Sequence, residues 1–345
     1  LKKTIGAAVV GRHLSSVEQT PSGPAPLYAQ TLAREFNVLV PANEMKPKSV
    51  HPTAEEWNFA AADAMVAFAE QHGMAVHGHT LFWPQDRHTQ EFLLAINDPA
   101  ALQAQIVAQT RAMVRHFGGR VRVWDAVNEA VGRPGHVRRL LGGATGYEHV
   151  ALAFRVARDE LDKLGHRNVK LLYNDNNIER PSSDPKARVN LVYGMLKDFA
   201  TRTPRVPVDG VGFQYHIGLG GATGAEWRET AQRLIDLGLT VSVTELDINL
   251  GRDEVKSPEL LRAQRDKYFG IVQACMQLPA CTGVTTWGFT DKHTWLKAFD
   301  PDGVGSDGPN PYPAPLLFDE SYAKKPAYYG VLRALRLLST PGPTG

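Results

Sequence analysis

The sequence predicts an α/β fold, specifically a (β/α)8 TIM barrel. Short runs of β-branched and aromatic residues alternate along the chain with longer amphipathic stretches, which indicates strands connected by helices. Eight such runs are present, the number that closes a parallel barrel. Two of them, Val121–Val127 and Leu239–Asp247, end on polar side chains that include Glu129 and Glu245. Because the carboxyl ends of barrel strands meet on one face, these glutamates are expected to share a cleft.

The strands and helices follow from the period of apolar residues. The expected strands are Thr4–Val10, Asn37–Ala42, Ala75–His79, Val121–Val127, Val169–Asn174, Gly210–Tyr215, Thr240–Asp247 and Gly283–Phe289. The expected helices are the end of the crossover Leu14–Arg34, then Trp57–His72, Ala100–Phe117, Tyr147–Leu164, Pro185–Thr201, Ala225–Leu237, Pro258–Leu278 and Tyr328–Leu338. A doubly wound sheet would need a glycine-rich fingerprint after the first strand, and Gly11-Arg12-His13 does not fit one.

Composition sets limits on domains and partners. The 345 residues are expected to form a single domain over 1–345, since the Pro- and Gly-rich run Pro301–Pro315 is followed by another helix. A net charge of +2 with dispersed basic residues indicates no nucleic-acid partner. No apolar run is long enough for a membrane helix, and Leu1-Lys2-Lys3 leads directly into a strand, so no signal peptide is expected.

The two cysteines, Cys275 and Cys281, are separated by five residues near a helix-to-strand turn. This spacing allows a disulfide, and it equally allows two buried thiols. With no histidine near them, they do not form a structural zinc site.

The polar residues at the strand ends are of the kind that bind and cleave sugars. They are Asn43, Glu44, Lys46, His77, His79, Trp83, Asn128, Glu129, Asn174, Asp175, Asn176, Gln214, His216, Glu245, Asp247, Trp287 and Trp295. Amides hydrogen-bond hydroxyl groups and tryptophan faces stack on sugar rings. Two facing glutamates are what glycoside hydrolysis requires, and the set contains no serine elbow or cysteine nucleophile.

Several ordered motifs resemble glycoside hydrolase family 10, the β-1,4-xylanases. They are NEMKP (Asn43–Pro47), GHTLFW (Gly78–Trp83), WDAVNEA (Trp124–Ala130), VTELDI (Val243–Ile248) and TTWGFTDKHTWL (Thr285–Leu296). The resemblance extends from the first strand to Lys325–Tyr328, which is almost the whole chain.

This resemblance implies a retaining endo-1,4-β-xylanase with Glu129 as acid/base and Glu245 as nucleophile, which act without a cofactor. The two carboxyl groups are then expected roughly 5–5.5 Å apart. It also implies that Asn128 donates to the sugar 2-OH and that Gln214 supports the nucleophile and substrate. The remaining substrate-binding residues that it implies are Asn43, Lys46, His79, Trp83, Trp287 and Trp295.

The residues themselves agree with these roles. Glu245 and Asp247 are two apart on a strand and therefore point to the same side. His216, at the end of the neighbouring strand, is expected to bridge them by hydrogen bonds, which keeps Glu245 ionised as a nucleophile requires.

Three positions depart from the family pattern. Ala42 replaces a glutamate before Asn43, Trp83-Pro84-Gln85-Asp86 replaces Trp-His-x-Gln, and His77 replaces an arginine before Gly-His. We interpret Ala42 and Asp86 as changes in the non-reducing-side subsites, where each lost hydrogen bond costs roughly 1–3 kcal/mol. The alternative function is therefore a family-10-like hydrolase that acts on decorated xylan or another β-glycoside.

Two other functional classes stay open: a metal-dependent hydrolase and a non-catalytic binding protein. His77 and His79 form a His-x-His pair at a strand end, which in a metal-dependent barrel hydrolase binds a metal. A non-catalytic polysaccharide-binding barrel is the other, although both carboxylates are present. Cys275 and Cys281 lie where some family members carry a disulfide, which fits a secreted protein whose leader is absent from this chain. We expect a monomer that binds xylan or its oligosaccharides and no membrane.

Overall fold

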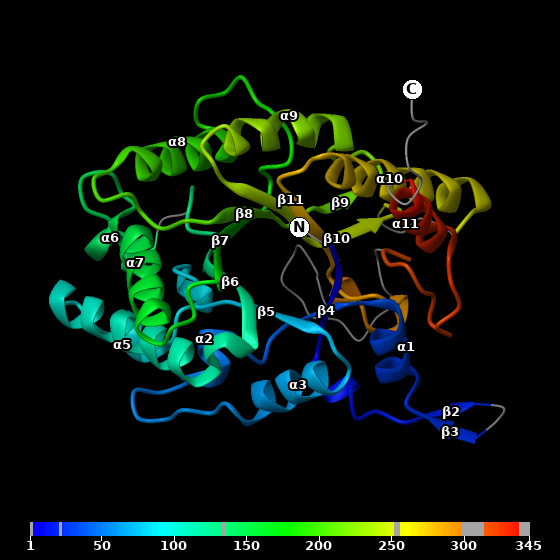
Figure 1. Cartoon of the computed structure of the whole chain (residues 1–345), viewed down its shortest axis with the longest axis horizontal. Helices are drawn as coiled ribbons and strands as arrows, with labels where there is room; N and C mark the ends of the chain where they lie inside the picture. Colours follow the sequence, from blue (N-terminus) through cyan, green and yellow to red (C-terminus); the bar gives the residue numbers. More distant parts are fainter. Residues whose placement is uncertain (1–2, 21–22, 133–134, 252–255, 298–313, 338–345) are drawn as a thin grey trace.

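In a computed structural model, described for residues 3–20, 23–132, 135–251, 256–297 and 314–337, the chain forms a parallel barrel with helices around it (Figure 1). The strands are β1 (Thr4–Val9), β4 (Val38–Pro41), β5 (Ala75–His79), β6 (Val121–Asn128), β7 (Lys170–Asp175), β8 (Gly210–Phe213), β10 (Thr240–Asn249) and β11 (Cys281–Thr286). Each pairs in parallel with the next, and β11 pairs with both β10 and β1, which closes the barrel. The predicted fold class is confirmed.

The helices match the expected positions, with shorter bounds in most cases. They are α1 (Leu27–Glu35), α3 (Ala60–Gln71), α5 (Pro99–Phe117), α7 (Glu148–Lys163), α8 (Arg188–Thr201), α9 (Gly224–Ile235), α10 (Pro258–Gln277) and α11 (Pro326–Arg336). N-cap side chains determine where several helices begin. Asp98 accepts from Ala101 N at the start of α5, and Thr223 forms a capping box with Glu226 at the start of α9. The last residue of the expected final helix, Leu338, lies outside the described residues.

Some short elements were not expected from the sequence. They are the hairpin of β2 (Glu18–Thr20) and β3 (Gly23–Ala25), the strand β9 (His216–Gly218), and the helices α2 (Pro47–Val50), α4 (Glu91–Leu94) and α6 (His136–Leu141). The 3-10 helices are η1 (Gly11–His13), η2 (Asp86–His88), η3 (Gly118–Arg120), η4 (Asp291–His293) and η5 (Trp295–Lys297). Strand β9 pairs with the end of β10, placing His216 beside Asp247.

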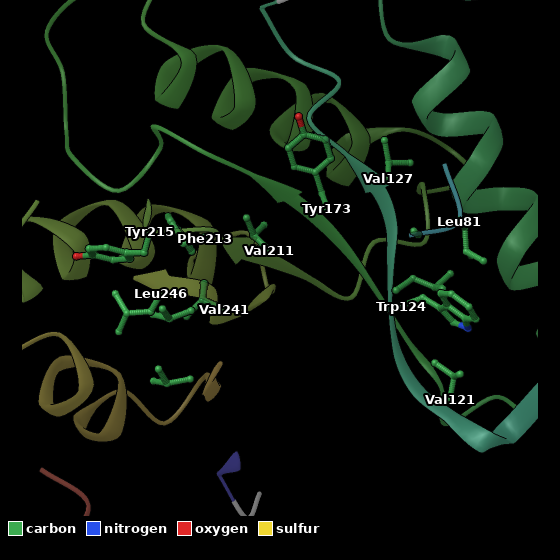
Figure 2. Close-up of a cluster of buried hydrophobic side chains, with 14 of the residues drawn as sticks. Leu81, Val121, Trp124, Val127, Tyr173, Val211, Phe213, Tyr215, Val241 and Leu246 are labelled. Carbon is green, nitrogen blue, oxygen red and sulfur yellow. The ribbon is translucent and has the colours of Figure 1, made fainter. Parts of the chain in front are cut away.

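The hydrophobic core lies between the barrel and its helices. Side chains on the outer face of the strands, including Trp124, Phe213 and Leu246, are fully buried there (Figure 2). A second, smaller cluster fills part of the barrel interior and contains mostly small residues, Ala8, Val38, Val40 and Ala42. The outer layer therefore supplies most of the apolar burial, and the interior is left for polar side chains and space.

Among the described residues, no helix has the length and apolar character that a membrane crossing requires.

Candidate active site

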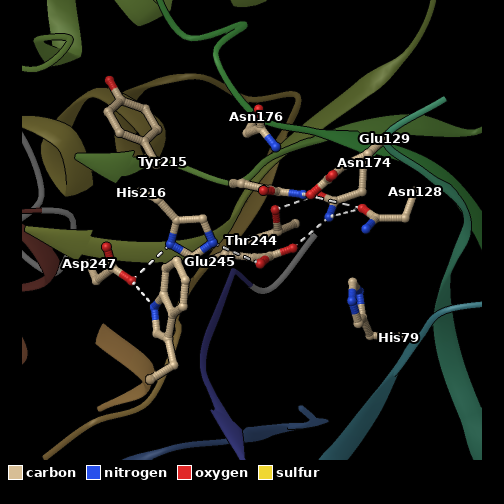
Figure 3. A network of polar contacts seen from close by, with 12 residues as sticks. His79, Asn128, Glu129, Asn174, Asn176, Tyr215, His216, Thr244, Glu245 and Asp247 are labelled. Carbon is tan, nitrogen blue, oxygen red and sulfur yellow. Dashed lines mark hydrogen bonds and ion pairs between the residues drawn. The ribbon is translucent and has the colours of Figure 1, made fainter. Parts of the chain in front are cut away.

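The carboxyl ends of the barrel strands bring the expected polar residues together in one network (Figure 3). Glu245 and Asp247 come from β10, His216 from β9, Asn174 from β7 and Asn128 from β6, with Glu129 directly after it. All but His216 are less than a tenth exposed. Buried polar groups of this kind need partners, and the network supplies most of them.

Glu245 is held by donors on both of its carboxylate oxygens. The Asn174 amide donates to Oε1 over 2.7 Å, and His216 Nε2 donates to Oε2 over 3.0 Å. The other ring nitrogen, His216 Nδ1, donates to Asp247 Oδ2 over 2.8 Å, so the imidazole bridges the two acids as expected.

His216 is held as a cation, because each of its nitrogens faces a carboxylate and both must carry a proton to donate. Burial alone would lower the pKa of His216, but Asp247 and then Glu245 outweigh it and raise that pKa well above its ordinary value. The imidazole thus fixes the positions of the Glu245 and Asp247 carboxylates relative to each other. Asp247 Oδ2 also accepts from Trp295 Nε1 over 2.8 Å.

Glu129 lies in an unusual backbone conformation just past the end of β6. Its φ of 49° is in the left-handed region, which is uncommon for a residue with a side chain. The conformation is fixed by backbone bonds: Glu129 N donates to Asn174 O over 2.9 Å, and Ala130 N and Val131 N both donate to the Tyr173 hydroxyl over 3.2 Å. The neighbouring strand β7 thus positions the acid.

The Glu129 carboxylate receives two side-chain amides. Gln85 Nε2 donates to Oε2 over 2.5 Å, and Gln214 Nε2 donates to Oε1 over 2.9 Å. Gln85 also donates to the Glu129 carbonyl over 3.2 Å. These contacts fix both the backbone and the carboxylate plane of Glu129.

Asn128 connects the two acids and keeps one donor available. Its Oδ1 accepts from Asn174 over 2.9 Å and from Gln214 over 3.3 Å, while its buried Nδ2 has no hydrogen-bond partner among the described residues. An unsatisfied buried donor is costly unless a ligand completes it. Asn128 can therefore donate to a substrate hydroxyl.

One wall of the site is aromatic. The His79 ring lies edge-on to Trp83 and Trp287, with centroids 5.7 and 5.2 Å away. Trp295 is edge-on to His216 at 4.9 Å. Lys46 lies over Trp83, 5.4 Å from its centroid, and donates to Asn43 Oδ1 over 2.9 Å. The six side chains expected to bind substrate beside Asn128 thus cluster at one side of the acids.

The comparison with known proteins decides the family. The family model described as glycosyl hydrolase family 10 matches residues 2–334. The chain belongs to glycosyl hydrolase family 10.

Relatives and solved structures of the family agree over most of their length. Endo-1,4-beta-xylanase B of Thermotoga neapolitana is 34% identical over 316 residues, which cover 88% of this chain and 82% of that protein. The structure of xylanase 10B from Thermotoga petrophila in complex with xylobiose has a TM-score of 0.84 at 31% identity, covering 98% and 95% of the two chains. An intracellular xylanase from Thermoanaerobacterium saccharolyticum has a TM-score of 0.78 at 26% identity, with 95% of each chain covered.

The family-10 site departs from the sequence-based expectation at two side chains. Gln214 was expected to support the nucleophile, but its amide contacts Glu129 and Asn128, and Glu245 is instead held by Asn174. The expectation that Asp86 faces the sugar subsites is wrong. Asp86 is exposed and accepts from His136 N over 2.8 Å at the start of α6, and its neighbour Gln85 faces the site.

His77 and His79 share one partner in this family-10 chain. His77 Nε2 contacts Asp125 Oδ1 over 2.9 Å and His79 Nδ1 contacts Asp125 Oδ2 over 2.8 Å. Burial would raise the pKa of Asp125, but the two imidazoles lower it below its ordinary range. Within the described ranges, no group of three or more histidine, cysteine or acidic side chains could hold a metal ion.

Cys275 and Cys281 form a disulfide with an S–S distance of 2.03 Å, at the opposite end of the barrel from the acids. Of the two arrangements that the spacing allowed, a disulfide or two buried thiols, the structure has the disulfide.

Proposed function

We propose that this family-10 glycoside hydrolase is a retaining endo-1,4-β-xylanase, with Glu245 as nucleophile and Glu129 as acid/base. The observation that carries the proposal is the different environment of the two acids. Glu245 is bonded to a histidine cation, which holds and orients its carboxylate for attack as a nucleophile. Glu129 is bonded to the amides of Gln85 and Gln214, which donate to its carboxylate without carrying a charge.

The reaction follows from these environments. Glu129 protonates the glycosidic oxygen while Glu245 attacks the anomeric carbon, which gives a covalent glycosyl-enzyme and releases the leaving sugar. Glu129, now a carboxylate, removes a proton from water, and that water displaces Glu245. The amide of Asn128 donates to the 2-OH of the sugar being cleaved, and the aromatic wall stacks on the sugars of the non-reducing side.

Chemical rescue separates the two roles. In Glu129→Ala, azide attacks the glycosyl-enzyme in place of the water that Glu129 would have deprotonated, so activity on an aryl xylobioside is restored and a β-glycosyl azide forms. In Glu245→Ala, azide attacks directly and an α-glycosyl azide forms. We expect these opposite anomers, and the same anomer from both variants would contradict the assignment.

A second candidate function is a family-10-like hydrolase whose subsites on the non-reducing side of the cleaved bond differ from the family pattern, and Ala42 favours it. Ala42 packs in the interior with Val40 and Trp287, so no carboxylate extends from this position toward the sugars. We therefore propose that linear xylan is bound more weakly than decorated xylan. Initial rates on linear xylan, arabinoxylan and cello-oligosaccharides would test this, and a faster rate on linear xylan would exclude it.

We also propose that the protein acts as a monomer outside the cell. The disulfide supports an oxidising compartment, and a polymer cannot enter a cell. Sedimentation of the purified chain and assay of its culture medium test the two statements.

A further inference from the structure

A cavity lies inside the barrel at the end opposite the active site. Its volume is about 200 Å³, and its lining comes from the first residues of the strands. Thr4, Val38, Ala75, Lys170, Thr240 and Thr282 surround its outer part. Barrel interiors are normally filled by layers of bulky branched side chains.

Small residues explain why the cavity is open. Gly6, Gly210 and Gly283 occupy interior-facing positions, because a Cβ on each would lie 2.6, 2.3 and 2.1 Å from the hydroxyl of Thr285, Thr240 or Thr4. Short threonine and glycine side chains meet there and do not reach the barrel axis. Engineered apolar cavities of roughly 150 Å³ accept a benzene molecule, so this space is large enough for a six-membered ring.

The walls and the mouth differ in character. Val38, Val123 and Leu172 give apolar walls. Ser242, which is 7% exposed, also lines the cavity, and its hydroxyl has no hydrogen-bond partner among the described residues. An apolar ring fits these walls, and a polar substituent on it would satisfy Ser242.

The mouth is cationic. The exposed side chain of Arg122 lines it and makes no ion pair or hydrogen bond with the part of the chain that the structure describes. Lys170 lines it too, although Asp209 lies 3.3 Å from its ammonium. Arg122 also lines an open groove on the base of the barrel together with Arg115, Arg120 and His166. Arg115 and Arg120 pair with Glu160 and Glu70, so among the described residues Arg122 is the cation at the entrance that stays available to an anionic group.

We propose that this cavity is a binding site for a small monocarboxylate with an aromatic or similarly sized apolar body. The apolar body enters the barrel between Val38 and Leu172, and the carboxylate pairs with Arg122 at the mouth. Arg122 presents a planar guanidinium that matches a carboxylate with two parallel hydrogen bonds.

The inner wall of the cavity touches the layer that supports catalysis. His77 lines it and contacts Asp125, which in turn holds His79 of the sugar site. Thr244 lines it and donates over 2.6 Å to Asn174, the partner of Glu245. If the proposed roles of these groups hold, a bound ligand that shifts either side chain changes kcat. The binding itself does not depend on those roles.

The test is calorimetric titration of the full chain with 3-phenylpropanoate and with its neutral amide. We expect one site for the acid, and about tenfold weaker binding of the acid by Arg122→Gln, with no change for the amide. Arg120→Gln is the matched control, because Arg120 lies in the same groove, pairs with Glu70 and does not line the cavity. Ser242→Ile fills the interior and should abolish binding of both compounds.

Each outcome decides the proposal. No binding of the acid at millimolar concentration overturns it, and so does unchanged binding in Arg122→Gln. If Ser242→Ile does not fold, Arg122→Gln still gives the decision, because that side chain is exposed. Loss of binding in Ser242→Ile with normal activity on xylan supports the site, whether or not the rescue experiment confirms the roles of Glu129 and Glu245.

Discussion

At the scale of single residues, the side chain that distinguishes this site is Gln85. Its amide donates to both the carboxylate and the carbonyl of Glu129, so it restrains the acid at two points. The sequence motif suggested that Asp86 would replace a family glutamine at the sugar subsites. A shift by one residue along an extended segment turns a side chain to the opposite side. The sequence alone does not determine that register, which explains why this expectation failed.

Removing the Gln85 amide should lower activity without unfolding the protein. In Gln85→Ala, we expect kcat on a xylo-oligosaccharide to fall about ten- to a hundredfold, because Glu129 loses one of its positioning contacts. Asp86→Ala is the matched control, since the adjacent side chain faces α6 and should leave kcat unchanged. Equal loss in both variants would contradict the role of Gln85.

The Tyr173 hydroxyl is expected to position the backbone of Glu129 in a similar way. It accepts from Ala130 N and Val131 N and donates to Asp175 over 2.5 Å. Tyr173→Phe leaves both amides without this acceptor, and we expect kcat to fall about tenfold with little change in KM. Tyr215→Phe provides the comparison, because within the described part of the chain that hydroxyl donates to Thr223 O, over 3.0 Å, and does not contact Glu129. A loss confined to KM would show that Tyr173 acts on substrate binding instead.

At the scale of elements, the eight strands and the long helices could be predicted because their apolar periods are strong. The hairpin β2–β3 was not expected, because its strands are three residues each and β3 contains proline and glycine. Asn174 was recognised as a polar strand end, but its bonds to Asn128 and Glu245 depend on the register of β7 against β6 and, through β8, of β10. That register follows from the closed barrel, which no local pattern specifies.

Strand β7 also carries a buried acid that should make stability depend on pH. Burial, with a small contribution from Glu129, raises the pKa of Asp175 to about 7, although Tyr173 and Arg188 oppose this. The folded chain then keeps a proton that the unfolded chain releases near pH 4. The contribution of Asp175 to the free energy of unfolding is therefore fully present below about pH 4. It is lost as the pH rises toward 7, a change of about 4 kcal/mol at most.

Asp175→Asn removes this titration, so urea unfolding at pH 5 and pH 8 should differ less in the variant than in the native chain. An equal difference in both would mean that Asp175 is ionised across this range.

His149, on helix α7, should make the stability of the chain depend on pH in the opposite direction. This side chain is 1% exposed, neither ring nitrogen has a partner within the described residues, and burial lowers its pKa to about 4. The unfolded chain takes up a proton near pH 6.5 and the folded chain does not, so stability falls as pH drops from about 6.5 to 4, by about 3 kcal/mol. His149→Phe should remove that loss in unfolding curves at pH 5. His116→Phe is the control, since His116 is partly exposed and pairs with Asp63 over 2.8 Å.

At the scale of the whole molecule, the barrel separates a catalytic end from a structural end. At the structural end, Lys3 donates to the carbonyls of Cys275, Met276 and Leu278 over 2.7, 2.7 and 2.6 Å. These bonds join the first strand to the turn between α10 and β11. The disulfide closes the same turn, so one short region links the first and last strands of the barrel. Global stability should therefore respond to this region while the site does not.

The disulfide tests that separation. Its two cysteines are 6 positions apart, and cross-linking so short a loop stabilises the folded chain by about 2 kcal/mol through the entropy of the unfolded state. We expect the double variant Cys275→Ser, Cys281→Ser to unfold at correspondingly lower urea concentration, with kcat and KM on xylo-oligosaccharides unchanged below the transition. Reduction of the native chain with dithiothreitol should give the same shift, and the reductant should not affect the double variant. A fall in kcat in the fully folded double variant would show that the structural end is coupled to the catalytic end, because β10 and β11 carry residues of both.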